Sequence, residues 1–164
     1  MPTLLLLRHA KSAWPPGVPD FDRPLNPRGR RDAPVAGRVL AARPAVDLAL
    51  VSPAERAVQT FALAGAEFDP PGLVRQDRRI YDAVCEDLLD VLAEVPAEVG
   101  CVLLVGHNPG IEDLAIRLSR PDETPDMLAM TEKYPTSGLA HIEIGGSWAQ
   151  PEQGELVSFA VPRG

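Results

Sequence analysis

The segment Thr3-Leu-Leu-Leu-Leu-Arg-His9 begins as an almost unbroken apolar run and ends in two residues that can carry positive charge. Two similar apolar runs follow, at residues 47–51 and 101–105. Continuous runs of this length predict strands that are buried on both faces of a parallel sheet. Ligands of such sheets bind beyond the carboxyl ends of the strands. The polar residues directly after each run are therefore the first candidates for a functional site.

Helix-start signals follow the second and third runs. Ser52-Pro53-Ala54-Glu55 predicts an N-cap, a proline at the first helical position and a reciprocal glutamate, with a helix continuing to about Ala64. Asn108-Pro109 repeats this pattern after the third run. The residues that follow it place one apolar face at helical spacing, at Ile111, Leu114, Ala115 and Leu118.

Two further helices are expected between the strands. Asn26-Pro27 predicts a helix toward Ala42, and Pro34 inside it is expected to kink the helix or delay its start. The segment 86–94 predicts another helix, with three leucines facing inward, Leu88, Leu89 and Leu92.

Two alternating segments late in the chain, 140–144 and 157–161, predict strands that complete the sheet. The alternation of strands and helices predicts an α/β fold, a three-layer sandwich in which a mostly parallel central sheet has helices on both faces. A chain of 164 residues suits one domain over residues 1–164.

Composition excludes several classes of protein. A formal net charge of −7 argues against nucleic-acid binding, which depends on Lys and Arg neutralising phosphates. The apolar run that ends at Arg8 is too short for a membrane helix or a signal peptide, so we expect a cytoplasmic protein without membrane contact. Cys85 and Cys101 are too few for a disulfide framework and are expected to be buried free thiols.

Two of the three histidines lie directly after predicted strands: His9 beside Arg8, and His107 after the third run. Arg56 falls in the first turn of the helix that follows the middle run. Together these four residues would form a pocket rich in donors, whose guanidinium groups match the oxygens of a phosphoryl group. The third histidine, His141, lies on the polar side of an alternating strand and is expected to be solvated.

The charge of such a pocket predicts the state of its histidines. Flanking guanidinium groups are expected to lower the pKa of a histidine, which keeps its imidazole neutral and nucleophilic. A bound dianion would raise the pKa of a neighbouring imidazole. One histidine can then attack phosphorus while the other donates a hydrogen bond.

The sequence resembles the histidine phosphatase superfamily, with its phosphoglycerate mutase-like fold, and within it the small phosphohistidine phosphatases of the SixA type. The resemblance rests on five segments in the family's order: LRHAKSAW at 7–14, DFDRPLNPRGRRDA at 20–33, SPAERAVQT at 52–60, VGHNPGIEDLA at 105–115 and YPTSGLAHIEI at 134–144. It implies that His9 is the nucleophile and becomes a covalent phosphohistidine. It implies further that Arg8, Arg56 and His107 bind the oxygens of the transferring group, with no metal and no cofactor.

Additional substrate-binding candidates are Asp20, Asp22, Ser12 and Asn108. Acid-phosphatase-like members of the superfamily place an aspartate directly after the second histidine, where this chain has Asn108. Spacing alone selects no carboxylate as the general acid. The absence of an evident acid favours a leaving group that departs readily, such as the imidazole of a phosphohistidine.

These features predict a phosphatase that acts on a phosphorylated partner, most simply phosphohistidine on a protein. The alternatives are a small-molecule phosphomonoesterase, a phosphomutase or a phosphate-binding module without catalysis. A histidine-carboxylate metallohydrolase is disfavoured because the H-E-x-x-H spacing is missing. The sequence leaves the physiological substrate and the oligomeric state open.

Overall fold

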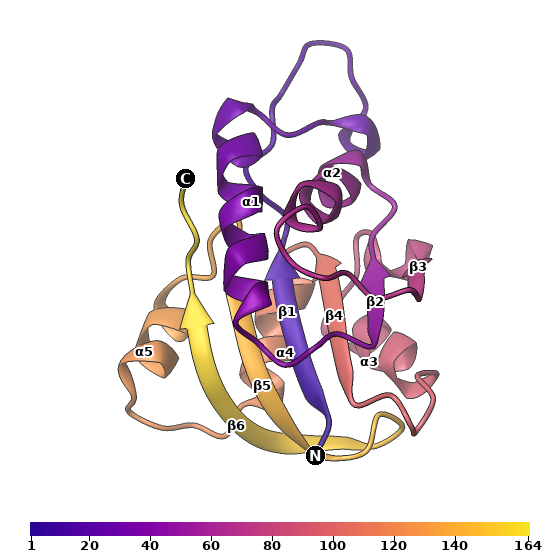
Figure 1. Cartoon of the computed structure of the whole chain (residues 1–164), viewed down its shortest axis with the longest axis vertical. Coiled ribbons are helices and arrows are strands. Elements are labelled where there is room, and N and C mark those ends of the chain that lie inside the picture. The colour runs from indigo at the N-terminus through magenta and orange to yellow at the C-terminus, as the bar shows by residue number, and fades with distance from the viewer.

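The apolar runs form the middle of a six-stranded sheet in the computed structural model, which describes residues 1–164. The strand order is β3-β2-β4-β1-β5-β6 (Figure 1). The first four strands are parallel, β5 is antiparallel to β1, and β6 is antiparallel to β5. The strands are β1 (Thr3–Arg8), β2 (Leu48–Val51), β3 (Val74–Gln76), β4 (Cys101–Gly106), β5 (Leu139–Gly146) and β6 (Pro151–Ala160). The mostly parallel central sheet is confirmed.

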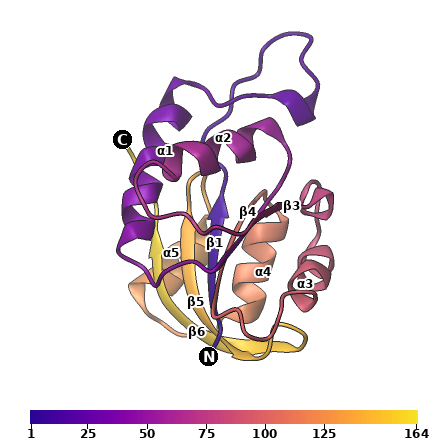
Figure 2. The same ribbon diagram turned by 45° about the vertical axis from the view of Figure 1, so that its right-hand side comes forward.

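Helices cover both faces of this sheet. The helices are α1 (Pro27–Ala41), α2 (Glu55–Ala64), α3 (Cys85–Ala93), α4 (Gly110–Leu118) and α5 (Pro125–Glu132), together with two short 3₁₀ turns, η1 (Asp20–Asp22) and η2 (Arg78–Ile80). Figure 2 shows α1 and α2 in front of the sheet and α3, α4 and α5 behind it. The predicted three-layer sandwich is therefore confirmed.

Alternate residues of β1, β2 and β4 contribute to two hydrophobic cores on opposite faces of the sheet. Leu4 and Leu6 of β1 belong to the larger core, which α3, α4 and α5 complete. Leu5 and Leu7 point to the other face and pack with α1 and α2. Because all four leucines are fully buried, β1 fixes the centre of the molecule and the position of the polar residues after it.

Backbone hydrogen bonds hold the carboxyl ends of three strands level. Arg8 pairs with Gly106 across β1 and β4, and the amide of His9 donates to the carbonyl of Gly106 at 3.0 Å. The amide of Ser52, directly after β2, donates to the carbonyl of Val105 at 3.0 Å. Side chains that follow β1, β2 and β4 thus emerge at one edge.

Most helix predictions are confirmed, but the expected delay of α1 does not occur, and α2 and α4 begin after the positions that their cap patterns predict, α4 at Gly110. The α1 helix begins at Pro27 without delay despite Pro34, because the Asn26 side chain accepts a hydrogen bond from the amide of Gly29 at 2.8 Å. The α2 helix begins at Glu55 rather than after Ser52. The Ser52 hydroxyl accepts from the nearby amide of Ala54 at 3.3 Å and so does not cap the helix.

The other predicted elements are present, although β6 begins at Pro151, six residues before the predicted strand at 157–161. The α3 helix covers Cys85–Ala93, and the apolar face predicted for α4 is buried. Strand β3 and helix α5 were not predicted from the sequence. His141 is 6% exposed and its Nε2 lies 2.9 Å from Oε1 of Glu143, so the expectation of a solvated histidine is wrong. Both cysteines are buried free thiols, as expected.

The long segment between β1 and α1 arches above the carboxyl edge of the sheet (Figure 1). Its base is closed by a bridge between Ser12 and Leu25 and by the amide of Asn26, which donates to the carbonyl of Lys11 at 3.0 Å. This closure fixes the 3₁₀ turn η1 near the ends of the strands. None of the helices has the length and apolar character needed to cross a membrane.

The contact between α1 and α2 gives a test of the fold. A Cβ on Gly37 would collide with the carbonyl oxygen of Ala64. Gly37→Ala is therefore expected to destabilise the protein by about 1–3 kcal/mol, although alanine favours an exposed helix by about 1 kcal/mol. Urea unfolding measures the change.

Gly72→Ala is the matched control, because a Cβ there meets no heavy atom within 4 Å. Its free energy of unfolding should stay within about 0.5 kcal/mol of the parent value. A stabilising Gly37→Ala substitution would mean that the two helices do not pack this closely.

Candidate active site

The structure brings the four predicted residues together at the carboxyl edge of the sheet. Arg8 ends β1 and His9 follows it, Arg56 is the second residue of α2, and His107 is the first residue after β4. The ring centroids of His9 and His107 lie 5.1 Å apart. Arg8 and Arg56 are both close enough to act electrostatically on each histidine.

His9 is held in one tautomer by the backbone. Its Nδ1 lies 2.7 Å from the carbonyl oxygen of Ala10, and the side chain is 6% exposed. A carbonyl oxygen can only accept, so Nδ1 carries the proton of the neutral ring. The lone pair of Nε2 is then free to act as a nucleophile.

His107 presents the opposite nitrogen. Its Nε2 lies 2.7 Å from Oγ of Ser52, while its Nδ1 is buried without a partner. Because the Ser52 oxygen already accepts from the amide of Ala54, the hydroxyl proton can be donated to Nε2. The neutral ring then carries its own proton on Nδ1, which makes that atom a donor for a ligand.

Arg56 is oriented by Asp20 from the loop above it. Its Nη1 donates to the Asp20 carbonyl at 2.7 Å and its Nη2 to Oδ2 at 3.1 Å. The same carboxylate accepts from the hydroxyl of Tyr81 at 2.6 Å and from Nε of Arg23 at 3.0 Å. Asp20 therefore joins its own loop to α2 and to the residue that follows η2.

The bonds to Asp20 decide its charge. The hydrogen bond from Tyr81, with further contributions from Arg23 and Arg56, lowers the pKa of Asp20 to about 2 against an opposing effect of burial. The carboxylate is ionised near neutral pH. Asp20 thus has the properties of a fixed counter-charge for the arginines rather than of a proton donor.

Arg8 is anchored on the other side of the site. Its Nη1 donates to the carbonyl of Tyr134 at 3.0 Å, and Nδ2 of Asn108 donates to the same oxygen at 2.9 Å. Asn108 also accepts from the amide of Glu112 at 3.3 Å. The predicted candidate Asn108 thus contacts the same carbonyl as Arg8 and also the first turn of α4.

Both histidines are biased toward the neutral form. Burial is the largest cause that lowers the pKa of His9 well below its usual value, and His107, Arg56 and Arg8 add to it. Burial followed by Arg56 lowers the pKa of His107 to about 4, against the opposing charge of Asp20. The predicted direction is confirmed, although burial contributes more than the guanidinium charges.

The remaining sequence candidates differ in position. Ser12 is buried and its hydroxyl accepts from Nη1 of Arg23 at 2.7 Å, whereas Asp22 is exposed at the end of η1. Sequence reasoning missed Ser52, Arg23 and Tyr81. The position of Ser52 directly after a strand was an available signal. Nothing in the local pattern singled out Tyr81, whose ring packs edge-on against His107 with centroids 5.6 Å apart.

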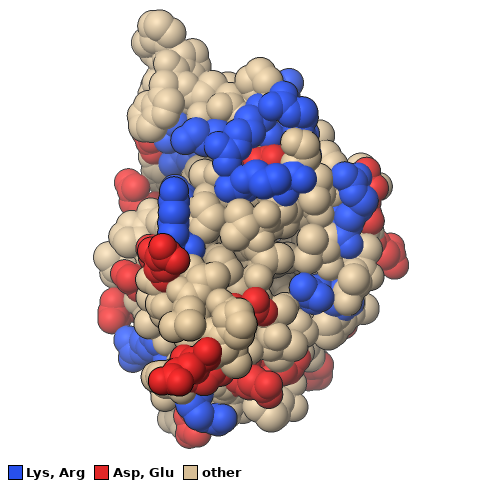
Figure 3. All heavy atoms as spheres, turned by 90° about the vertical axis from the view of Figure 1, so that its left-hand side faces the viewer, with Lys and Arg blue, Asp and Glu red and all other residues tan.

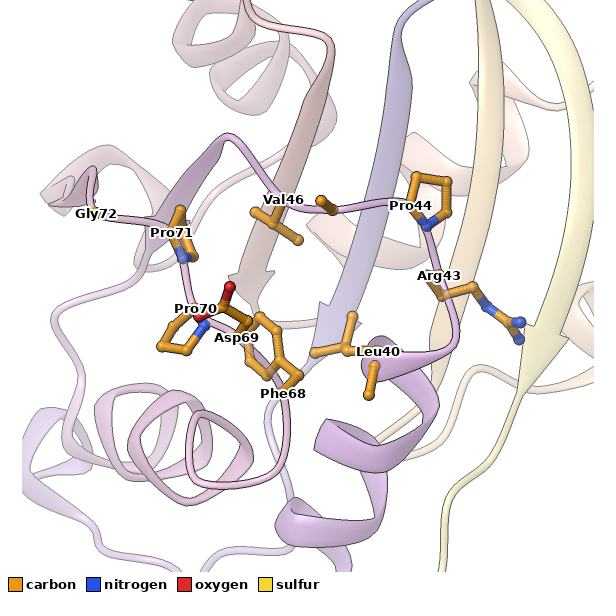
Figure 4. Close-up of a pocket in the computed structure, with 11 residues that line it drawn as sticks. Leu40, Arg43, Pro44, Val46, Phe68, Asp69, Pro70, Pro71 and Gly72 are labelled. Carbon is orange, nitrogen blue, oxygen red and sulfur yellow. The ribbon is translucent and has the colours of Figure 1, made fainter.

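One cavity of the protein lies away from these residues. It has a volume of about 330 Å³ and is lined by residues between Leu40 and Val46 and between Phe68 and Gly72, near the amino end of β2 (Figure 4). It contains no histidine, and Asp69 and Arg43 are its charged residues. No three His, Cys, Asp or Glu side chains are grouped so that they could hold a metal ion.

The lowered histidine pKa values predict how stability depends on pH. Below about pH 6.5 the two histidines become protonated in the unfolded chain but stay neutral in the folded protein. The free energy of unfolding therefore falls with acidification. The slope is up to about 1.4 kcal/mol per pH unit for each histidine. His107→Gln should make it shallower, as measured by urea unfolding at about pH 7, 6 and 5. Equal slopes in the two proteins would contradict a depressed pKa at His107.

Comparison with known proteins places the chain in a family. The model of the histidine phosphatase superfamily (branch 1) matches residues 4–83, a range that includes Arg8, His9 and Arg56. The uncharacterized protein Rv1276c of Mycobacterium tuberculosis (strain H37Rv) is 44% identical over 162 residues, which cover 96% of this chain and all of that protein.

Two solved structures match over nearly the whole chain. The putative phosphohistidine phosphatase SixA from Nakamurella multipartitia is 31% identical, with a TM-score of 0.86, covering 98% of this chain and 96% of that one. The putative phosphohistidine phosphatase SixA from Agrobacterium tumefaciens is 34% identical, with a TM-score of 0.80, covering 98% and 99%. By sequence and by fold, this chain belongs to the histidine phosphatase superfamily, branch 1, and resembles its SixA members.

Proposed function

We propose that the protein is a phosphatase that removes the phosphoryl group from phosphohistidine by way of a covalent intermediate on His9. One observation carries the proposal. Nε of Arg8, Nε of Arg56 and Nδ1 of His107 are all buried and all lack a hydrogen-bond partner. An unsatisfied buried donor costs about 1–3 kcal/mol, a cost that a phosphoryl group bound among the three residues removes.

In the first step, Nε2 of His9 attacks phosphorus. A P–N bond to His9 forms while the P–N bond to the substrate imidazole breaks, and the departing imidazole keeps the electron pair. Arg8, Arg56 and His107 offset the charge on the phosphoryl oxygens during this transfer, which is the principal task of a phosphoryl-transfer site. The bond from Nδ1 of His9 to the Ala10 carbonyl keeps the nucleophile aligned.

In the second step, water attacks the phosphorus of phosphorylated His9. The P–N bond breaks, inorganic phosphate leaves, and the imidazole returns to the neutral form that its buried position favours. Dividing hydrolysis into two displacements lets the same donors act twice.

The choice of phosphohistidine rests on the leaving group. An imidazole whose second nitrogen is protonated leaves without further help, whereas an alkoxide needs a proton in the transition state. Asp20, the carboxylate bonded to Arg56, is ionised at neutral pH and offers no such proton. The names of the two SixA relatives agree with this substrate class.

The covalent step predicts labelling of one histidine. His9→Gln is expected to lose at least about 10³-fold in activity, because the nucleophile is gone. It should also lose the acid-labile, base-stable phosphoryl label that the parent protein acquires from a radiolabelled phosphoramidate. Mass spectrometry of the labelled parent should place the phosphoryl group on His9.

The third histidine supplies the control for this experiment. His141→Gln retains a side chain that can bond to Glu143 and lies outside the site, so it should be labelled like the parent protein. Tight phosphate binding without label or turnover in the parent would instead identify a binding module.

The leaving-group argument predicts a strong substrate preference. The ratio kcat/KM is expected to be at least about 100-fold higher for a phosphohistidine peptide than for the matched phosphoserine peptide, since only the alkoxide needs protonation. Release of inorganic phosphate, measured with and without EDTA, checks the ratio. Comparable rates on both peptides would favour the phosphomonoesterase alternative.

A further inference from the structure

A small basic cavity lies directly beside the candidate active site. It has a volume of about 140 Å³, and none of its lining residues is hydrophobic. Its cationic residues are Arg8, Lys11, Arg28, Lys133 and Arg163. We call these five residues the basic hollow.

The positive charge of the hollow is only partly neutralised. Buried Asp32 lies below it, with Oδ2 3.4 Å from Nε of Arg28 and 3.5 Å from Nη1 of Arg163. Lys11 and Lys133 are exposed and form no side-chain hydrogen bond or ion pair. In a protein of net charge −7, a hollow lined by this local excess of cations attracts anions.

The composition of the hollow departs from the rest of the chain. The protein contains 14 arginines and two lysines, and both lysines line this one cavity although 121 residues separate them in sequence. Figure 3 shows Lys and Arg side chains gathered in the upper part of the face that carries α1 and the C-terminal segment, while acidic side chains dominate its lower part. Two unpaired ammonium groups at one cavity are suited to a carboxylate or phosphate ligand.

Arg8 connects the hollow to the candidate active site. Its charge acts on both His9 and His107, and Arg8 is also one of the residues that line the hollow. Lys11 follows His9 by two residues and is held by the amide of Asn26, which donates to the Lys11 carbonyl at 3.0 Å. An anion in the hollow would therefore lie next to a phosphoryl group at His9, close enough to belong to the same molecule.

We propose that the basic hollow binds a second anionic group, a carboxylate or a phosphate, of the substrate whose phosphoryl group is transferred to His9. This inference rests on the proposed function. The cavity accommodates one such group and no apolar moiety, so it selects substrates that carry an acidic group near the scissile phosphoryl. Lys11 and Lys133 supply specificity, and Arg8 serves both subsites.

The test compares Lys11→Gln/Lys133→Gln with Arg75→Gln/Arg120→Gln. The control pair is exposed, lies outside the hollow and changes the net charge by the same amount. One arm uses phosphohistidine peptides with glutamate or glutamine beside the phosphohistidine. The other uses α,ω-alkane bisphosphonates and the matching monophosphonates, with binding measured by calorimetry.

The parent protein should prefer at least one doubly anionic ligand by about tenfold, through KM for peptides or Kd for phosphonates. The lysine double variant should lose this preference, and the arginine control should keep it. A preference in the peptide arm identifies a carboxylate of a protein substrate, and a preference in the phosphonate arm identifies a second phosphate.

Two results overturn the inference: no preference in either arm of the parent protein, or a preference that both double variants retain or lose alike. The calorimetric arm needs no turnover. The protein could prefer bisphosphonates through the two lysines and yet hydrolyse neither peptide. This result would support anion binding in the basic hollow and contradict the proposed function.

Discussion

The amide of His9 donates to the carbonyl of Gly106, and the amide of Ser52 donates to the carbonyl of Val105. These two bonds continue the parallel ladder for one residue past each strand end, and the rest of the site depends on them. They place His9, His107 and the start of α2 at one edge, although the three segments are far apart in sequence. Four fully buried leucines in β1 make this arrangement costly to change.

Gathering two arginines and two imidazoles at a buried edge creates a problem of like charge. Two features of the structure reduce this repulsion. Burial keeps the imidazoles neutral, and the Asp20 carboxylate neutralises part of the guanidinium charge. What is left is a set of oriented donors without partners, Nε of Arg8, Nε of Arg56 and Nδ1 of His107. In the proposed mechanism these donors bind the phosphoryl oxygens, and donors that are in place before the reaction are the condition for electrostatic catalysis.

The sequence predicted the parts of this structure that local pattern controls. Apolar runs located β1, β2 and β4, and the rule that ligands bind beyond strand ends located His9 and His107. It did not predict contacts that depend on the path of a loop, such as Asp20 reaching Arg56 and Tyr81. Polar alternation misplaced His141, because its partner Glu143 lies two residues along the same strand and satisfies it in a buried position.

The scarcity of lysine has a practical consequence. Lys11 and Lys133 are the only lysines in the sequence, and Met1 lies at the opposite end of β1 in Figure 1. Amine-directed coupling to a bead, a sensor chip or a dye would therefore attach the molecule either by its terminus or at the rim of its own site. Acylation of these two side chains would convert the most accessible positive charge near His9 into neutral amide.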